Sequence, residues 1–441
     1  MNKKVRKFIV LLAKIAVAVG LLWLVARKVY WNDYAVSMTG EYVPVLPTTD
    51  SAAHPGQLFA KDSAGQGQWQ GTQRFRPLYV TWEGKNASVQ NAQPGWDHPQ
   101  QYEIQRPDGQ RLWLTSAQID LKSAQYIARG LRNTLLSAKP WLLGLSAIFS
   151  VMPLLITSLR WWYLLSILDI HVGGFEVVRL TFLGQFFSFV VPGTVSGDLV
   201  KAWYVAKHTP RKAAVLVSVF IDRVIGLLEF AILPAVVMVV MLASGVGAMS
   251  RFRTPAIMVV VVLVMVAGSL SLLLSPGLRR MLRVSWLVKR LPMQKHLQII
   301  AEAANLYRKR AGALFKALAI TFGSQFFFIG AIFLAGLSLG LPVPWYQYFL
   351  YVPLIYIIAA IPISPGGLGV AETFYVMFFT PSGSEPWTVS ASQILALALV
   401  ARLIPMLVSL PGLVVAVTGP KRPKSSDMQA ELEGGQASSV L

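Results

Sequence analysis

The sequence predicts an all-α polytopic membrane protein with a small β-containing domain outside the membrane. Hydrophobic residues make up 54% of the 441 residues, and charged residues only 14%, which is about half the charged share of an average soluble domain. The mean hydropathy is +0.54, and the basic residues gather at the ends of long apolar segments. This composition excludes a disordered chain and argues against an ordinary soluble enzyme.

The charge balance points to a lipid surface. Lysine and arginine number 40 against 20 acidic residues, which gives a net charge of +20. On a soluble protein this excess would indicate nucleic acid, but on so apolar a chain it indicates a cytoplasmic membrane face, so we expect an anionic lipid surface as partner and no nucleic acid. The chain has no cysteine and its five histidines lack metal-ligand spacing, so we expect no metal and no cofactor.

The first 139 residues contain an anchor and a polar domain. Residues 1–31 are predicted to form an N-terminal transmembrane helix, because four basic residues precede an apolar run and no small-residue cleavage site follows it. Residues 32–139 are rich in Gln, Gly, Pro and Asp and are predicted to be an extracytoplasmic domain. We expect a strand over residues 75–82, a hairpin of residues 102–106 and 111–115 around a Pro-Asp-Gly turn, and a helix over residues 116–136.

Residues 140–418 are predicted to be the transmembrane domain, and residues 419–441 a cytoplasmic tail. Five apolar segments clear the ~20 residues that a bilayer requires; they are residues 141–168, 213–243, 255–275, 312–340 and 389–417. With the N-terminal helix they make six spans. Two further apolar stretches, residues 175–205 and 345–380, are broken by Pro and Gly, and their arms are mostly too short to cross alone.

The basic clusters set the orientation. They lie in residues 207–212, in residues 276–310 and at the start of the tail, and six crossings place all of them on the side of the N-terminus. We therefore expect a multi-pass protein of the bacterial cytoplasmic (inner) membrane with both termini in the cytoplasm. The basic stretch from 279 to 310 carries interleaved Trp and Leu residues and is predicted to lie on anionic lipid.

The two broken stretches share a pattern. Each reads Pro-Gly, a short spacer, Gly and then an acid; the residues are Pro192, Gly193, Gly197 and Asp198 in the first, and Pro365, Gly366, Gly369 and Glu372 in the second. The next helix of each half carries a similar phrase, around Arg223 and around Arg402. These matches predict an inverted repeat of helix, re-entrant hairpin and helix, in residues 141–243 and 312–417. The alternative is two tight turns at the membrane surface.

Broken helices inside a membrane can form an anion site, because freed N–H groups and half-helix N-termini favour negative charge. The candidate substrate-binding residues are Pro192, Gly193, Gly197, Asp198, Lys201, Asp222, Arg223, Pro365, Gly366, Gly367, Gly369, Glu372 and Arg402. In the functional interpretation Arg223 and Arg402 hold a lipid phosphate, and the three acids balance them or contact a cationic headgroup. In the structural interpretation these groups form internal ion pairs between hairpin and helix, with Asp198 and Lys201 paired at i and i+3.

Other polar residues in the predicted spans receive simpler interpretations. Arg160 with its two neighbouring tryptophans is expected to anchor a helix end at the interface. Gln185, Gln325 and Gln393 are expected to form hydrogen bonds between helices. Glu229 is either a cavity residue or a partner for a neighbouring arginine.

Three motifs together resemble a known family. SFVVPGTVSGDLVKAW at residues 188–203, FIDRVIG at 220–226 and IPISPGGLGVAE at 361–372 resemble, in that order, the flippase-like, lysylphosphatidylglycerol synthase transmembrane family, which includes the membrane half of the multiple peptide resistance factor. The resemblance covers residues 141–417 and implies translocation of a phospholipid or polyprenyl-linked lipid. The chain departs from the family pattern at Ser196, where Gly is usual, and at Lys201, where Arg is usual.

The predicted function is a lipid translocase that moves an anionic phospholipid or polyprenyl-linked lipid between leaflets, and not an enzyme. Only a short tail follows residue 418, so we expect no synthesis of lysyl-lipid by this chain. One alternative is a membrane-embedded lipid-modifying enzyme such as a lipid-linked glycosyltransferase, with Asp33 as its external acid. Another is a membrane scaffold whose external domain binds a protein partner.

Overall fold

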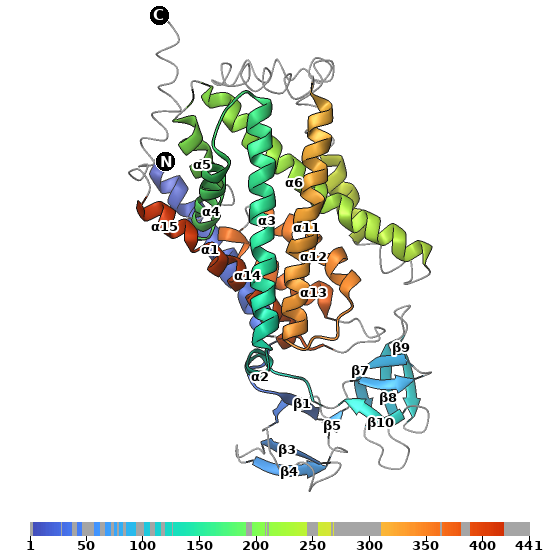
Figure 1. Ribbon diagram of the computed structural model, residues 1–441. Helices are drawn as coiled ribbons and strands as arrows, with labels where there is room; N and C mark the ends of the chain where they lie inside the picture. The colour runs from blue at the N-terminus through green and yellow to red at the C-terminus, as the bar shows by residue number, and fades with distance from the viewer. Residues whose placement is uncertain are drawn as a thin grey trace, which may run out of the picture. The chain divides into compact units, whose positions relative to one another are not determined.

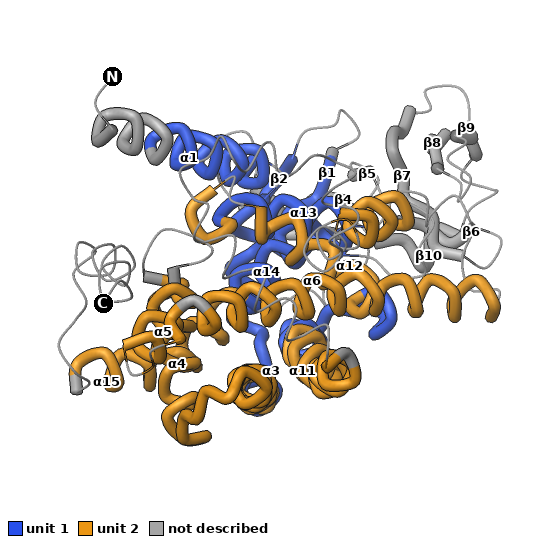
Figure 2. The backbone as a smooth tube through the Cα atoms, turned by 90° about the horizontal axis from the view of Figure 1, so that it is seen from above, with its two compact units in different colours: residues 1–144, 333–347, 368–401 blue, residues 145–332, 348–367, 402–441 orange. Residues whose placement is uncertain are grey.

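The structure is a computed structural model, and most of its elements are helices (Figure 1). It describes residues 3–27, 29–37, 42–45, 127–190, 196–207, 209, 211–244, 255–265, 268, 310–361, 364–380 and 389–418, together with strands between residues 57 and 125. The chain forms two compact units, coloured separately in Figure 2. Unit 1 comprises residues 1–144, 333–347 and 368–401, and unit 2 comprises residues 145–332, 348–367 and 402–441.

Four helices are long and apolar enough to cross a membrane, as their sequences predict. These spans are Pro140–Ile167, Ala214–Ala243, Gly312–Ser338 and Ala391–Val417. They correspond to α3 (Pro140–Ile167), α6 (Lys212–Ala243), α11 (Ala311–Ser338) and the pair α14 (Ala391–Val408) and α15 (Pro411–Thr418). The N-terminal helix α1 (Lys3–Ala26) and the apolar helix Pro255–Met265 are also helical as expected, but their role as spans stays a prediction.

The predicted extracytoplasmic domain contains strands in three sheets. The first contains β1 (Tyr34–Ser37), β2 (Tyr42–Pro44) and β5 (Phe75–Arg76), and the second contains β3 (Gln57–Lys61) and β4 (Gly67–Gly71). The third has the order β10 (Asp120–Gln125), β6 (Tyr79–Trp82), β7 (Lys85–Gln93), β8 (Gln101–Gln105), β9 (Arg111–Thr115). Strands β8 and β9 confirm the predicted hairpin, in antiparallel register from Gln101 opposite Thr115 to Gln105 opposite Arg111.

Two predictions for this domain were wrong. Residues 75–82 form two strands in different sheets rather than one, because residues 75–76 pair with β1 and residues 79–82 pair with β7 and β10. Among the described residues of the helix predicted over 116–136, α2 (Leu131–Leu136) is helical and residues 120–125 form β10 instead. Pairing with β6 supplies the backbone hydrogen bonds of this segment, so sheet context overrides its local propensity.

Within unit 2, α3 and α11 pack antiparallel. Ser146 Oγ of α3 donates a hydrogen bond of 2.6 Å to the carbonyl of Ala331, and Phe149 lies against Gly330, where an added Cβ would come within 3.2 Å of its ring. Later on α3, Arg160 contacts Thr321, which lies earlier on α11. Residues later on α3 thus contact residues earlier on α11, so the two helices are antiparallel. Gly330 permits their close approach.

The first broken stretch consists of two helices, α4 (Gly174–Val190) and α5 (Ser196–Ala206), which pack tightly in unit 2. A Cβ added to Gly197 would lie 1.9 Å from the carbonyl oxygen of Gly184 and 2.3 Å from Ser188 Oγ. No larger residue fits this crossing without moving one arm. The close approach of the two arms thus requires glycine at position 197.

The second broken stretch contains α12 (Trp345–Ala360), a 3-10 turn (Pro365–Gly367) and α13 (Val370–Phe379). Gly366, Gly367 and Gly369 have φ values of 59°, 69° and 79°, in the left-handed region that glycine adopts without strain. In unit 1, α13 packs against α1, and a Cβ on Gly369 would lie 2.7 Å from the carbonyl oxygen of Ala18. Glycines therefore make this break possible, as the sequence predicts.

Candidate functional site

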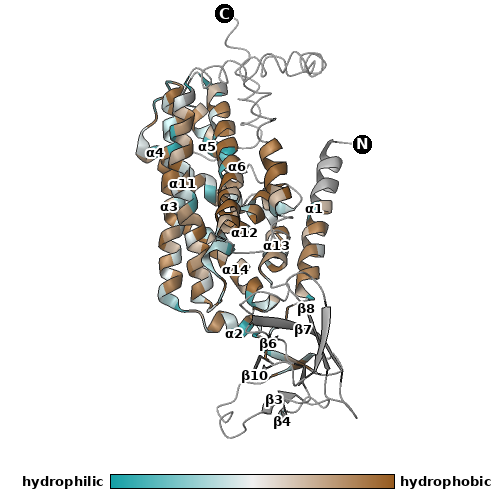
Figure 3. Cartoon of the chain, turned by 90° about the vertical axis from the view of Figure 1, so that its right-hand side faces the viewer, coloured by the Kyte–Doolittle hydropathy of each residue, from teal (hydrophilic) through white to brown (hydrophobic). Residues whose placement is uncertain are grey.

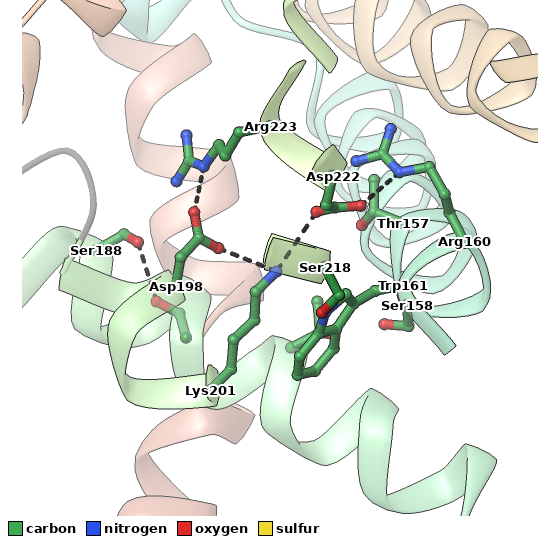
Figure 4. A network of polar contacts seen from close by, with 12 residues as sticks. Thr157, Ser158, Arg160, Trp161, Ser188, Asp198, Lys201, Ser218, Asp222 and Arg223 are labelled. Atoms are coloured by element: carbon green, nitrogen blue, oxygen red, sulfur yellow. Dashed lines mark hydrogen bonds and ion pairs between the residues drawn. The ribbon is translucent and has the colours of Figure 1, made fainter. Parts of the chain in front are cut away.

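Charged side chains from three helices of unit 2 form a continuous chain of ion pairs (Figure 4). Arg223 Nε of α6 binds Asp198 Oδ2 of α5. Asp198 Oδ1 lies 3.0 Å from Lys201 Nζ, and Lys201 Nζ lies 3.6 Å from Asp222 Oδ2. Asp222 Oδ1 accepts a hydrogen bond of 2.7 Å from Arg160 Nε of α3. We call these five residues the ion-pair chain; it connects α5, α6 and α3.

Local helix geometry explains how the chain forms. Asp198 and Lys201 lie at i and i+3 on α5, so their side chains meet on one face of this helix. Asp198 also lies in the first turn of α5, where the helix dipole stabilises negative charge. Asp222 and Arg223 are consecutive on α6 and point to different faces. Asp222 therefore reaches α3 while Arg223 reaches back to Asp198.

Burial changes sharply along the ion-pair chain. The exposed side-chain fractions are 6% for Arg160, 8% for Asp222, 9% for Lys201 and 12% for Asp198, but 48% for Arg223. Buried charges are tolerated when each has a partner, and the four inner residues partner one another. The chain therefore ends in a half-exposed arginine. Figure 3 shows that the long helices of the protein are mostly hydrophobic.

Aromatic and hydroxyl groups support the inner part of the chain. Lys201 Nζ lies 4.7 Å from the centre of the Trp161 ring, a cation–π geometry. Trp161 Nε1 donates to Ser218 Oγ of α6 at 3.2 Å, and Arg160 Nη1 donates to Thr321 Oγ1 of α11 at 3.1 Å. These bonds connect α3 to both α6 and α11.

The prediction that Arg160 and its neighbouring tryptophans anchor a helix end was wrong for the first two residues. Arg160 is 5% exposed and Trp161 is fully buried. The reason is that α3 continues to Ile167, so Arg160 lies about two turns before the end of the helix. Only Trp162 is exposed, at 41%.

Glu229 lies next to the ion-pair chain, about two turns after Asp222 on the same face of α6. It is 1% exposed, it contacts Gln325 of α11, and it lies within electrostatic reach of Arg160. Among the described residues Glu229 forms no ion pair with an arginine, because Arg160 pairs with Asp222, so Glu229 borders the ion-pair chain without being one of its links. Among the described residues, Glu229 Oε1 has no hydrogen-bond partner.

Glutamines were expected to form hydrogen bonds between helices; Gln325 lies between two helices, but Gln393 bonds within its own helix. Gln325 of α11 contacts Glu229 of α6, so it lies between two helices as expected. Gln393 Oε1 instead accepts a hydrogen bond of 3.0 Å from the backbone N–H of Ser390. Because Ser390 immediately precedes α14, Gln393 caps its own helix rather than bonding to another one.

Arg402 binds the second break through backbone carbonyls in unit 2. Its Nη1 lies 3.3 Å from the carbonyl oxygen of Gly366, and its Nη2 lies 3.2 Å from that of Gly367. A guanidinium donates in a planar fork, which suits two adjacent acceptors. The two arginines predicted to hold a phosphate thus each have protein partners, carboxylate for Arg223 and carbonyls for Arg402.

Glu372 belongs to unit 1 and caps α13. It is 1% exposed, and its Oε2 accepts a hydrogen bond of 2.8 Å from the backbone N–H of Gly369. This bond satisfies an N–H group at the start of the helix, which has no partner within the helix itself.

The candidate residues therefore separate into three groups. Asp198, Lys201, Asp222 and Arg223 meet in the ion-pair chain, where Gly197 packs the arms together. Arg402 binds the carbonyls of Gly366 and Gly367, beside Pro365, and Gly369 binds Glu372. Pro192 and Gly193 lie outside the described residues.

Asp33, the acid of the enzyme alternative, is engaged by the backbone of unit 1. Its Oδ1 accepts a hydrogen bond of 2.7 Å from the N–H of Gly130, and its carbonyl accepts one of 2.8 Å from Val45. These bonds tie together the two ends of the predicted extracytoplasmic domain. This geometry explains Asp33 without catalysis.

Arg160, Glu229 and Thr321 belong to the site or border it but were not among the candidate substrate-binding residues. The sequence had suggested an interface anchor for Arg160 and two open interpretations for Glu229. A usable signal existed for Glu229, because a spacing of seven residues from Asp222 places both acids on one face of a helix. No comparable signal existed for Thr321, whose role depends on the packing of α3 against α11.

The fold and the site define a multi-pass helical membrane protein with a buried, charge-paired polar centre. A family model described as "Lysylphosphatidylglycerol synthase TM region" matches residues 119–412. The chain belongs to this family, and the match contains every residue of the ion-pair chain and of the second break. No curated protein matches the chain.

Proposed function

We propose that this protein is a flippase-like lipid translocase that moves an anionic phospholipid or polyprenyl-linked lipid between leaflets. The observation that carries the proposal is the ion-pair chain, four buried charges that end in the half-exposed guanidinium of Arg223. Charged groups among apolar helices are costly, so they mark pathways for polar cargo by default. Membership of a family associated with lipid substrates supports the same conclusion.

Arg223 is the contact we propose for the lipid phosphate. A guanidinium binds phosphate through two parallel N–H donors, a geometry that lysine does not offer. The phosphate would compete with Asp198 for Arg223, and Lys201 would then retain Asp198 at 3.0 Å. The lipid headgroup thus exchanges one partner of Arg223 for another, and no buried charge loses all of its partners.

The proposed topology has six spans and two re-entrant hairpins in an inverted repeat. Its support is the antiparallel packing of α3 and α11, the first helices of the two predicted halves. Arg211 Nη1 and Arg310 Nη1 donate to the carbonyls of Leu168 and Ile167, at the end of α3, over 2.9 Å and 2.6 Å. Both arginines come from the predicted cytoplasmic segments, which supports an inner-membrane protein with cytoplasmic termini.

Reconstitution tests this function. The full chain is placed in phosphatidylcholine vesicles with fluorescent phosphatidylglycerol, and leaflet exchange is followed by quenching the outer leaflet. We expect the wild type to speed exchange and Arg223→Ala to abolish the effect. Arg179→Ala is the matched control, because Arg179 forms a partly exposed pair with Glu176 on α4. Exchange no faster than in empty vesicles, or release of a chemically altered lipid, would contradict the proposal.

A further inference from the structure

We propose that Glu229 binds a proton that accompanies each lipid anion, so that the protein is a proton–lipid cotransporter. The inference rests on the translocase function proposed above and names its coupling ion. Its basis is a buried carboxyl group that borders the ion-pair chain yet is not one of its links.

The first argument is the hydrogen bonding of Glu229. The residue lies in the middle of α6 and is 1% exposed, and among the described residues its Oε1 has no hydrogen-bond partner. A buried acceptor without a donor costs free energy, and more so when it carries charge. A proton on Oε1 removes the charge and reduces this cost. The side chain is therefore built to exchange a proton rather than to hold a fixed charge.

The second argument is what surrounds the carboxyl group. Gln325 contacts it from α11, and Arg160 of α3 and Asp222 of its own helix lie within electrostatic reach. Tyr356 of α12 stacks on the adjacent Phe230, with ring centres 6.4 Å apart. Arg160 is thus the one cation among these neighbours, and its ion pair is with Asp222, while Glu229 lies within its electrostatic reach.

The third argument is the charge of the whole cluster. The ion-pair chain contains three cations and two anions, so it carries one surplus positive charge. An ionised Glu229 neutralises this surplus, whereas a protonated Glu229 leaves it for a phosphate monoanion. Proton and lipid anion therefore each favour binding of the other, and this coupling is reciprocal by thermodynamic necessity.

The ion-pair chain offers a route for this coupling. When Glu229 takes a proton, Arg160 interacts more fully with Asp222, because its second anionic neighbour is gone. Asp222 then holds Lys201 less strongly, and Lys201 turns further to Asp198. Asp198 in turn competes less for Arg223, whose guanidinium becomes available to the lipid phosphate. The neutral pair of proton and lipid anion crosses without a net movement of charge.

The experiment follows lipid exchange and proton movement in the same reconstituted vesicles across a pH series. A trapped pH-sensitive dye reports protons, and the probe lipids are labelled phosphatidylglycerol and labelled phosphatidylcholine. Because a protonated Glu229 favours binding of the lipid anion, we expect wild-type phosphatidylglycerol exchange to become faster as the pH falls. The change should be up to about tenfold per pH unit, the slope for one linked proton, with matching proton movement. Glu229→Gln should exchange the lipid at a rate independent of pH and move no protons. Glu176→Gln, in the partly exposed pair on α4, should behave like the wild type.

The outcomes separate this inference from the proposed function. If the wild type exchanges lipid without pH dependence or proton movement, the proton-coupling inference is overturned but the translocase function is not. The same holds if Glu229→Gln keeps the wild-type dependence of lipid exchange on pH. No exchange of any anionic lipid by the wild type overturns both. If Glu229→Gln does not fold, infrared difference spectra of the wild type decide: a carboxylic-acid band that titrates and that lipid binding shifts supports the proposal, and its absence overturns it.

Discussion

Replacing Arg223 by alanine should affect stability less than replacing its ion-pair partner Asp198. This difference separates the lipid-binding interpretation of the pair from the structural one. Arg223 and Asp198 bind each other, but their side chains are 48% and 12% exposed. Removing a half-exposed partner from an ion pair costs little, about 0–1 kcal/mol. We therefore expect Arg223→Ala to keep nearly wild-type stability while it loses lipid exchange.

Asp198→Ala removes the common partner of Arg223 and Lys201. Lys201 is 9% exposed, and its remaining ion-pair partner among the described residues is then Asp222, at 3.6 Å. Leaving a buried charge poorly compensated costs about 3–5 kcal/mol. We expect Asp198→Ala to lower both the unfolding temperature and lipid exchange.

Thermal unfolding in detergent, followed by tryptophan fluorescence, measures the stability of both variants beside the vesicle assay. If Arg223→Ala destabilises the protein as much as Asp198→Ala does, the pair is mainly structural. A swapped variant, Asp198→Arg with Arg223→Asp, provides the complementary test. Recovery of both stability and exchange in this variant would refute the proposed contact between Arg223 and the lipid.

Three further predictions concern the broken stretches. Gly197→Ala forces a Cβ against the facing carbonyl on α4 and should destabilise the protein by about 1–3 kcal/mol, whereas Gly226→Ala on α6, where nothing lies within 4 Å, should not. Glu372→Ala removes the cap of α13 and should cost about 0.5–2 kcal/mol; unchanged denaturant unfolding would rule out the cap. Arg402→Lys loses the fork that binds two carbonyls and should increase hydrogen exchange at the second break, and unaltered exchange rates there would contradict this role.

The sequence predicted the long helices well, because apolar length and basic flanks depend only on local composition. Residues 141–168 were expected as a span and α3 covers Pro140–Ile167. The helix expected over residues 116–136 failed because the partner strand β6 lies about 40 residues earlier in the chain and no local pattern names it.

Only the part of the site that depends on local sequence patterns was predicted. Asp198 and Lys201 lie close in sequence, so their pairing follows from helix periodicity and is confirmed at 3.0 Å. The bond between Arg160 and Asp222 joins residues 62 positions apart, and only the packing of α3 against α6 creates it. The sequence alone does not show whether a charged residue near a predicted helix end lies at the membrane interface or in a buried ion pair, since both positions favour the same residue types.

The structural and functional interpretations of the charged residues are compatible once burial is considered. The four inner charges neutralise one another in pairs, and this neutrality is the condition under which they can remain inside apolar helices. Arg223 is not needed for this neutrality, and it has the most exposed side chain of the five residues. Protonation of Glu229 removes one negative charge and so changes the net charge of the whole cluster. A purely structural chain of ion pairs gives no reason for a half-exposed guanidinium at one end. It gives no reason either for a buried carboxyl oxygen at the other end that has no hydrogen-bond partner among the described residues. The two features together are what a site needs in order to bind an anion at one end in response to a proton at the other.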